Sequence, residues 1–205
     1  METSDTGMSA RANRAGERRQ HLLDTARSLF VENGFHRTGM AQIATASGIK
    51  VGQIYRDFAS KEEIIAAICE ADVTDWLRED LLSAAVADND FVAVRQWIDR
   101  FSAPSDSPGD GSMLAEIVAE AWRNQRIAEL NRSIDERIRA SLDSALAALA
   151  PAPERAPGRA LLVEAILAMG FGMEMRRIIR PELDVAGLGK IIGTMISRYV
   201  DNDMR

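Results

Sequence analysis

The chain has 205 residues, which suits one domain or two small ones, and 46% of them are apolar. That apolar share can supply a core and excludes a disordered chain. A single cysteine, Cys69, excludes an internal disulfide framework, and with only two histidines beside it a structural zinc site is not expected. No stretch approaches the roughly 18 consecutive apolar residues of a membrane helix, and residues 1–19 lack the apolar segment of a secretory signal. We therefore expect a soluble, cytoplasmic protein with no metal, no cofactor and no membrane contact.

The formal net charge of −6 is unevenly distributed along the chain. Residues 1–61 hold nine Lys and Arg against six Asp and Glu, a net charge of +3, whereas the remaining residues hold 16 against 25, a net charge of −9. A basic segment joined to an acidic one favours contact between the basic segment and a polyanion such as a nucleic acid. Chance imbalance in a short window is the alternative explanation.

Helical periodicity dominates the sequence, and no run alternates in the manner of a strand, so we predict an all-α fold. The first helix carries Leu22, Ala26 and Phe30 on one face. It is expected to end at Gly34, because glycine tolerates the left-handed conformation. The pattern predicts about nine helices, near residues 14–32, 40–46, 51–57, 60–87, 91–101, 112–122, 127–149, 158–179 and 184–200.

Two of these helices have recognisable capping residues at their starts. Thr38 is expected to be the N-cap of the second helix. Ser60 and Glu63 form a capping box at the start of the fourth, in which the hydroxyl and the carboxylate each accept from an unpaired backbone N–H.

Residues 40–58 have the pattern of a helix-turn-helix, two short helices joined by a tight turn. Ala44 is small where the helices approach each other, Gly48 lies in the turn, and Ile49 and Ile54 are core positions. In such a unit the second helix presents its outer face to the major groove of DNA. The residues expected on that face are Lys50, Gly52, Gln53, Tyr55 and Arg56.

A wider set of spaced residues surrounds this unit. The set consists of Leu22, Leu23, Ala26, Leu29, Phe30, Gly34, Phe35, Thr38, Ile43, Ala44, Gly48, Ile49, Gly52, Ile54, Tyr55, Phe58, Ser60, Lys61, Glu62 and Glu63. With these residues at these spacings, the segment 18–65 resembles the DNA-binding domain of the TetR family of transcriptional regulators. The resemblance covers about the first third of the chain, and beyond it only the length and the helix plan are similar.

The resemblance implies binding to double-stranded DNA as a two-fold dimer, with one recognition helix in each half-site of a palindromic operator. It also implies that Tyr55 and Lys61 contact phosphates. Lys61 lies at the start of a helix, where free N–H groups and the helix dipole favour an anion, and Thr38 is a similar candidate. The residues expected to read bases are Lys50, Val51, Gly52 and Gln53.

Several of these residues have a simpler alternative role. Tyr55 could be a half-buried core aromatic, and Arg56 could be solvated without any contact. Lys50 stands where the family often has Ser or Thr, so the third helix either starts less firmly or uses this lysine on DNA. Arg11 and Arg14 are expected to form a flexible arm that reaches the DNA backbone or the minor groove.

The chain is expected to divide into a DNA-binding domain with that arm, residues 1–61, and a helical ligand-sensing and dimerisation domain, residues 62–205. In the second domain, helix 158–179 mixes large apolar residues with small ones such as Ala165 and Gly172, which allow helices to pack closely. By the resemblance, this helix and the last one form a four-helix interface with a second copy. A core helix within one chain is the alternative.

A ligand pocket is expected among bulky or pliable apolar residues of the second domain, although each could equally belong to an ordinary core. Glu116 and Glu120, four residues apart, share a helix face. They would favour a cationic ligand if that face points inward and would be merely solvated if it points outward. The expected lining residues are Trp97, Phe101, Met113, Ile117, Trp122, Met169 and Met173.

These observations predict a transcriptional repressor that a small-molecule ligand releases from its operator. The alternative is a DNA-binding regulator without small-molecule sensing, controlled by a partner protein or by its abundance. An enzyme is not expected, because His21 and His36 lie in the DNA-binding segment and Cys69 has no evident histidine partner.

Overall fold

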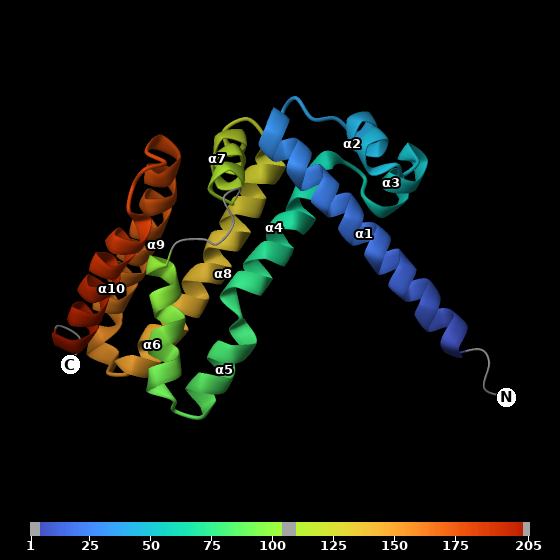
Figure 1. Ribbon diagram of the computed structural model, residues 1–205. Helices are drawn as coiled ribbons and strands as arrows, with labels where there is room; N and C mark the ends of the chain where they lie inside the picture. The colour runs from blue at the N-terminus through green and yellow to red at the C-terminus, as the bar shows by residue number, and fades with distance from the viewer. Residues whose placement is uncertain (1–4, 104–109, 203–205) are drawn as a thin grey trace. The chain divides into compact units, whose positions relative to one another are not determined.

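The structure, a computed structural model, describes residues 5–103 and 110–202. These residues form ten α-helices and two short 3-10 helices and contain no strand (Figure 1), so the all-α class is confirmed. The α-helices are α1 (Asp5–Asn33), α2 (Met40–Ser47), α3 (Val51–Asp57), α4 (Lys61–Leu77), α5 (Glu79–Ala87), α6 (Phe91–Asp99), α7 (Asp110–Ala121), α8 (Gln125–Leu149), α9 (Ala156–Ile179) and α10 (Val185–Asn202). The 3-10 helices are η1 (Arg100–Ser102) and η2 (Pro153–Arg155).

The helix expected near residues 60–87 is interrupted. Arg78 adopts a left-handed conformation, with φ of 47°, between α4 and α5. The carbonyl of Leu77, which the break frees from helical bonding, accepts a hydrogen bond from the indole N–H of Trp97 in α6. A tertiary contact therefore stabilises a break that no glycine or proline marks.

The start of the chain differs from the expected flexible arm. Helix α1 begins at Asp5 rather than near Arg14, so Arg14 lies within the helix. The side chain of Arg11 lies outside the described residues.

The chain divides into two compact units. Unit 1 comprises Met1–Asp72 and Glu116–Leu130, and unit 2 comprises Val73–Ala115 and Asn131–Arg205. The units differ from the division expected after Lys61, because most of α4 and the residues around the α7–α8 turn pack with the N-terminal helices.

The core of unit 1 holds the first three helices together. Phe30 and Phe35 are fully buried, and their ring centroids lie 5.3 Å apart. Gly34 follows the last residue of α1 and has φ of 81°. Its N–H donates to the carbonyl of Phe30, as expected for a C-cap glycine. The N-cap of α2 is Gly39 and not Thr38, because the Thr38 side chain points into the core instead.

Unit 2 has its own apolar core, built from α5, α6, α8, α9, α10 and the end of α4. Helices α9 and α10 lie side by side in it (Figure 1). The segment Pro153–Ile179 is long and apolar enough to cross a membrane by length and composition alone. Core helices of soluble proteins meet the same criterion, and α9 buries Val163, Ile166 and Met173 in the unit 2 core.

Candidate nucleic-acid interface

Helices α2 and α3 form the expected helix-turn-helix, with Gly48 in the turn at φ of 67°. Ile43 and Ile54 are fully buried on the inner side of the two helices. The end of α2 is fixed against α1, because the Nε2 atom of His21 lies 3.1 Å from the carbonyl oxygen of Ser47. The outer side of α3 is therefore presented from a rigid support.

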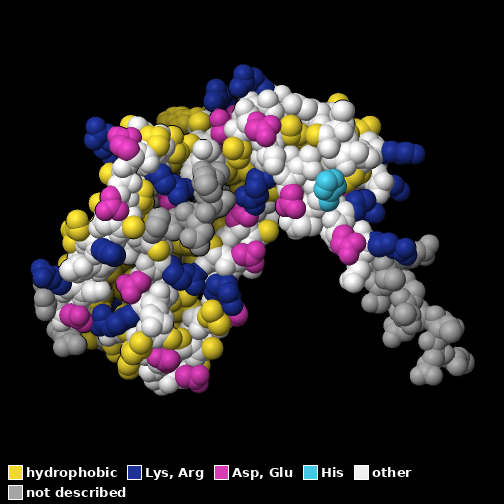
Figure 2. Space-filling view, viewed as in Figure 1, with side chains coloured by type: hydrophobic (Ala, Val, Ile, Leu, Met, Phe, Trp, Pro, Cys, Tyr) yellow, Lys and Arg dark blue, Asp and Glu magenta, His cyan; other side chains and the backbone are white. Residues whose placement is uncertain are grey.

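The outer side of α3 exposes most of the residues predicted to meet DNA. Tyr55 has an exposed fraction of 53%, which excludes the alternative of a half-buried core aromatic. Figure 2 shows Lys and Arg side chains over the part formed by α1, α2 and α3. The exposed residues of the predicted set are Lys50, Val51, Gly52, Tyr55 and Arg56.

Gln53 is half-buried and lies against Arg18 of α1, a residue that the sequence did not single out. With the amide oxygen of Gln53 turned toward it, the Nε atom of Arg18 donates a hydrogen bond of 2.9 Å. A terminal nitrogen of the same guanidinium lies 3.7 Å from a carboxylate oxygen of Asp57. Arg18 thus joins α1 to two positions of α3 and orients the predicted base reader Gln53.

A shallow depression of about 450 Å³ lies between α2 and α3. Lys50 and Val51 line it from the α3 side, next to the exposed face of that helix. The other lining residues are Ala41, Ala44, Thr45, Gly48 and Ile49.

Thr38 does not offer its hydroxyl to a phosphate in this conformation. The residue is 1% exposed, and its Oγ1 atom lies 3.0 Å from the carbonyl oxygen of Gly34 and 3.1 Å from that of Leu29. The hydroxyl therefore closes the loop between α1 and α2. The prediction of Thr38 as the N-cap of α2 is wrong, because Gly39 holds that position and the Thr38 side chain points into the core.

Lys61 lies at the start of α4, as predicted, but its ammonium group faces the α1–α2 loop. The Nζ atom donates to the carbonyl oxygens of Phe35 at 2.7 Å, Thr38 at 3.1 Å and His36 at 3.3 Å. It also lies 4.4 Å from the centroid of the Phe35 ring. Since an ammonium group has three protons, these contacts use all of its donors.

The capping box predicted at the start of α4 forms only on the carboxylate side, because the N–H of Glu63 donates to the Ser60 carbonyl and not to the Ser60 hydroxyl. Glu63 accepts a hydrogen bond of 2.7 Å from the backbone N–H of Ala59, one position before the predicted partner. Glu62 and Glu63 also contact the start of α8, through Asn124 at 3.2 Å and Arg126 at 3.4 Å.

Glu116 of α7 contacts the same α1–α2 loop, and the sequence did not predict this. Its Oε2 atom accepts a hydrogen bond of 3.1 Å from the backbone N–H of Phe35. A Cβ atom at Gly34 would lie 3.3 Å from the same oxygen. Glu116 is therefore bonded to the α1–α2 loop and is not merely solvated. Glu120, its predicted companion, is buried, with a carboxylate oxygen 3.8 Å from Arg123.

The seven residues predicted to line a ligand pocket do not come together. Trp97, Phe101 and Met173 belong to the unit 2 core, and Met169 packs against that core. Met113 is buried in unit 2, whereas Ile117 and Trp122 belong to unit 1. Trp122 is 92% exposed, so its assignment to an apolar cavity is wrong. Helical periodicity placed these residues on helices but could not tell which face each helix buries.

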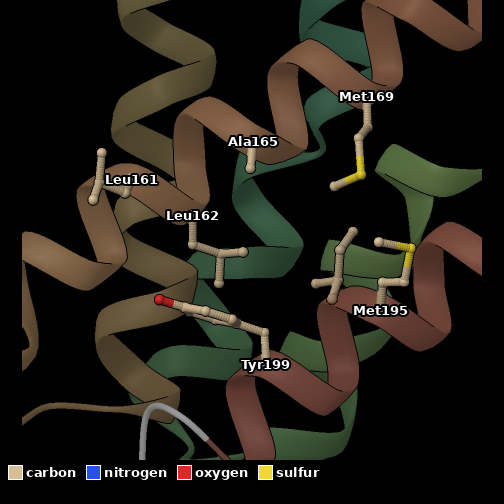
Figure 3. A pocket seen from close by; sticks show the side chains of 7 residues that line it. Leu161, Leu162, Ala165, Met169, Met195 and Tyr199 are labelled. Atoms are coloured by element: carbon tan, nitrogen blue, oxygen red, sulfur yellow. The ribbon is translucent and has the colours of Figure 1, made fainter.

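An apolar pocket of about 350 Å³ lies instead between α9 and α10 (Figure 3), and Met169 is its only lining residue from the predicted set. The remaining lining residues are Leu161, Leu162, Ala165, Met195, Ile196 and Tyr199. Large apolar side chains are exposed along these two helices, with Leu161 at 71%. The others are Phe171, Ile178, Ile179, Ile191, Met195 and Tyr199.

Cys69, a potential nucleophile, is buried in unit 1, and burial raises the pKa of its thiol to about 12. Within residues 5–103 and 110–202, no three His, Cys, Asp or Glu side chains are placed to hold a metal ion.

The helix-turn-helix region matches a known protein family. Residues 22–68 match the family model described as "Bacterial regulatory proteins, tetR family". Over these residues the chain carries the DNA-binding segment of the tetR family. This agrees with the resemblance carried by residues 18–65.

Individual TetR-family relatives extend the comparison. The HTH-type transcriptional regulator UidR of Escherichia coli is 31% identical over 115 residues, covering 55% of this chain and 56% of UidR. The HTH-type transcriptional repressor KstR2 of Mycobacterium tuberculosis is 38% identical over 66 residues, or 32% of each chain. The match thus spans about half the length of UidR and less of KstR2. Both descriptions name transcriptional regulators.

The fold is shared over most of the chain. The solved structure described as "SmeT-Triclosan complex" superposes with a TM-score of 0.73 at 19% identity, covering 88% of this chain and 90% of that chain. At this identity the similarity concerns the fold alone. The shared fold extends into the C-terminal helices, where the sequence itself carries no motif.

Proposed function

We propose that the chain is a TetR-type transcriptional regulator that represses its target genes by binding a palindromic DNA operator. The observation that carries this proposal is the exposed outer side of α3, presented by a helix-turn-helix whose inner side is fully buried. A recognition helix must combine these two properties to enter the major groove without unfolding.

The proposed contacts divide into base reading and phosphate binding. Lys50, Val51 and Gly52 face the bases, with Lys50 able to donate to guanine and Gly52 permitting close backbone approach. Gln53, oriented by Arg18, pairs with adenine. Tyr55 and Arg56 bind phosphates. Such contacts position the protein without reading sequence.

We assign a less direct role to Lys61. Its ammonium donates to three loop carbonyls, and this bonding supports a positioning role for the α1–α2 loop and hence for α2. The hydroxyl of Thr38 closes the same loop and is omitted from the proposed phosphate contacts.

A second copy of this chain is the proposed partner of α9 and α10. Their exposed apolar side chains and the pocket between them resemble half of an interface, and monomeric surfaces rarely expose so large an apolar group of residues. A two-fold dimer would place two recognition helices about one turn of DNA apart, as a palindromic operator requires.

We also propose that the protein is cytoplasmic and that a small-molecule effector releases it from its operator. A neighbour in fold was solved as a complex with triclosan, which is a property of that protein and supports the effector only by analogy. Control by a partner protein or by abundance is the second candidate. It is favoured by the packing of Trp97, Phe101 and Met173 in the unit 2 core, where a filled interior leaves a ligand less room.

Selection of binding sites from randomised duplex DNA tests the proposal. We expect the full-length protein to enrich an inverted repeat, and the double substitution Tyr55→Phe/Arg56→Gln to weaken binding of the enriched site. An enriched site without two-fold symmetry would contradict the dimeric mode, and failure to enrich any site would contradict DNA recognition by α3. Genes next to the matching genomic sites would then supply candidate effectors.

A further inference from the structure

The guanidinium group of Arg100, in η1, packs against two tryptophan rings of unit 2. Its Cζ atom lies 5.8 Å from the centroid of Trp76 and 5.6 Å from that of Trp97. Phe101 completes the cluster, with its ring centroid 4.7 Å from Trp76 and 5.3 Å from Trp97. Two tryptophan rings therefore contact one cation, and Phe101 packs against both rings.

This cation has no counter-ion in the described part of the chain. No described carboxylate lies within 4.0 Å of the Arg100 guanidinium, which interacts only with the two rings and with the charge of Arg78. The neighbouring Asp99 forms no ion pair with Arg100, and burial raises the pKa of its carboxyl while the charge of Arg95 lowers it. A partly buried charge without a partner is costly unless something else supplies the opposite charge.

Arg78 adds a second positive charge to the same place. It occupies the left-handed break between α4 and α5, and its Nε atom lies 3.7 Å from the carboxylate of Asp80. Both side chains of that pair are largely exposed, so the pair neutralises Arg78 weakly. Burial, and next the positive charge of Arg78, lower the pKa of Arg100.

Trp76 is the exposed member of the aromatic cluster. Trp76 is 40% exposed, whereas Trp97 and Phe101 are buried behind it. Guanidinium groups bind carboxylates through paired, planar hydrogen bonds, and an indole ring stacks on flat ligands. Two guanidinium groups beside one exposed indole thus provide the complementary chemistry for an anionic planar molecule.

We propose that Arg78, Arg100 and the exposed face of Trp76 form a binding site for a small molecule that carries a carboxylate on a planar ring. Such a ligand would supply the missing negative charge to Arg100 and Arg78 and stack on Trp76. This proposal assigns a chemical class to the effector of the proposed repressor, and in that respect it rests on the proposed function. Binding itself is measured without DNA, so a failure of the site and a failure of DNA recognition are distinguishable.

The test uses 2-naphthoate as the probe and titrates it into the full-length protein by calorimetry. The neutral analogue 2-naphthamide and the cationic analogue 2-naphthylmethylammonium keep the ring and change only the charge. We expect binding of 2-naphthoate with a dissociation constant below about 10 mM, the range of a good fragment, and at least about tenfold weaker binding of both analogues.

Three variants locate the site. Arg100→Gln removes the stacked charge, and Arg78→Asn removes the second charge with a residue that tolerates a left-handed backbone. Each is expected to weaken 2-naphthoate binding at least about tenfold, a loss of about 1.4 kcal/mol. Arg180→Gln removes an exposed charge of the same unit and is the matched control, with binding expected within about twofold of wild type. Circular dichroism and the melting temperature of each variant confirm that it is folded.

Several results would overturn the proposal. No heat and no fluorescence change with 2-naphthoate at about 10 mM would exclude the site for this class. Equal binding of 2-naphthamide would mean that the rings bind without the charges, and tighter binding of the cationic analogue would mean that the tryptophans form a cation site. Unchanged affinity in folded Arg100→Gln would place the ligand elsewhere.

Discussion

The ammonium group of Lys61 donates a hydrogen bond of 2.7 Å to the carbonyl of Phe35 and lies over the ring of the same residue. Glu116 accepts from the N–H of Phe35, so both polar groups of one loop residue are bonded to charged side chains from other helices. Because charge-assisted hydrogen bonds are stronger than neutral ones, this arrangement fixes the loop that leads into α2. The loop thereby becomes part of the support for the recognition helix.

Lys61→Met is expected to weaken DNA binding while leaving its salt dependence nearly unchanged. The substitution removes the donor to three carbonyls but keeps the apolar stem, and we expect a loss of about 1–2 kcal/mol in the free energy of unfolding. Fluorescence anisotropy over a salt series measures the slope of log affinity against log salt. A direct phosphate contact would instead lower that slope by about one, as expected for the control Arg56→Gln.

Glu116→Ala is expected to destabilise the protein, because the Phe35 N–H loses its acceptor in a partly buried place. We expect a loss of about 1–2 kcal/mol in the free energy of unfolding by urea. Glu116→Gln keeps a side-chain oxygen that can accept, so it should lie closer to wild type. Equal stability of the Ala and Gln variants would show that this hydrogen bond contributes nothing.

Tyr55→Phe is expected to reduce operator affinity by about 1 kcal/mol without a change in melting temperature. The hydroxyl of an exposed tyrosine contributes little to folding but can donate to a phosphate. Anisotropy and thermal melting on the same sample separate the two effects. A lower melting temperature at unchanged DNA affinity would assign Tyr55 a structural role.

Replacing Leu161 and Met195 together by Asp is expected to convert a dimer into a monomer. Both side chains line the pocket between α9 and α10, where two carboxylates would be desolvated by a second copy. Light scattering after size-exclusion chromatography gives the mass directly. Val92→Asp, on an exposed position of α6, is the control and should leave the mass unchanged. A monomeric wild type would contradict the proposed interface.

Arg137 is expected to stabilise unit 2 in a pH-dependent manner through Glu79. Hydrogen bonds from Arg137 are the main cause that lowers the pKa of the Glu79 carboxyl below its usual value of 4.5. A lowered pKa in the folded state contributes stability above the unfolded pKa, and this contribution is lost as the pH falls through the folded pKa. Arg137→Gln should therefore melt at a lower temperature than wild type at pH 7, and the difference should shrink below pH 4.5. A difference that stays constant across this range would mean that Glu79 is not involved.

The sequence predicted the parts of the fold whose causes are local. Gly34 and Gly48 occupy left-handed positions that their identity indicates, and Ile43 and Ile54 follow helical spacing. The break at Arg78 was not predictable, because it is stabilised by a hydrogen bond from Trp97 to Leu77, two residues that lie 20 positions apart in the sequence.

The candidate site was predictable to a similar degree. The exposed outer side of α3 followed from the motif, whereas the direction of the Thr38 hydroxyl and of the Lys61 ammonium depends on the loop between α1 and α2. Glu116 meets Phe35 across a separation of 81 residues, and no local pattern encodes such a contact.

The burial of Cys69 makes the protein suitable for distance measurements with thiol-directed labels. Cys69 is the only cysteine of the chain, and with a pKa of about 12 its thiolate fraction near pH 7 is about 10⁻⁵. Thiol-directed labels should therefore not react with Cys69. They should react with a cysteine introduced on the exposed side of α3, for example by Arg56→Cys. One spin label per chain would then report the separation of the two α3 helices in the proposed dimer, with and without a candidate effector, while the native sequence stays otherwise intact.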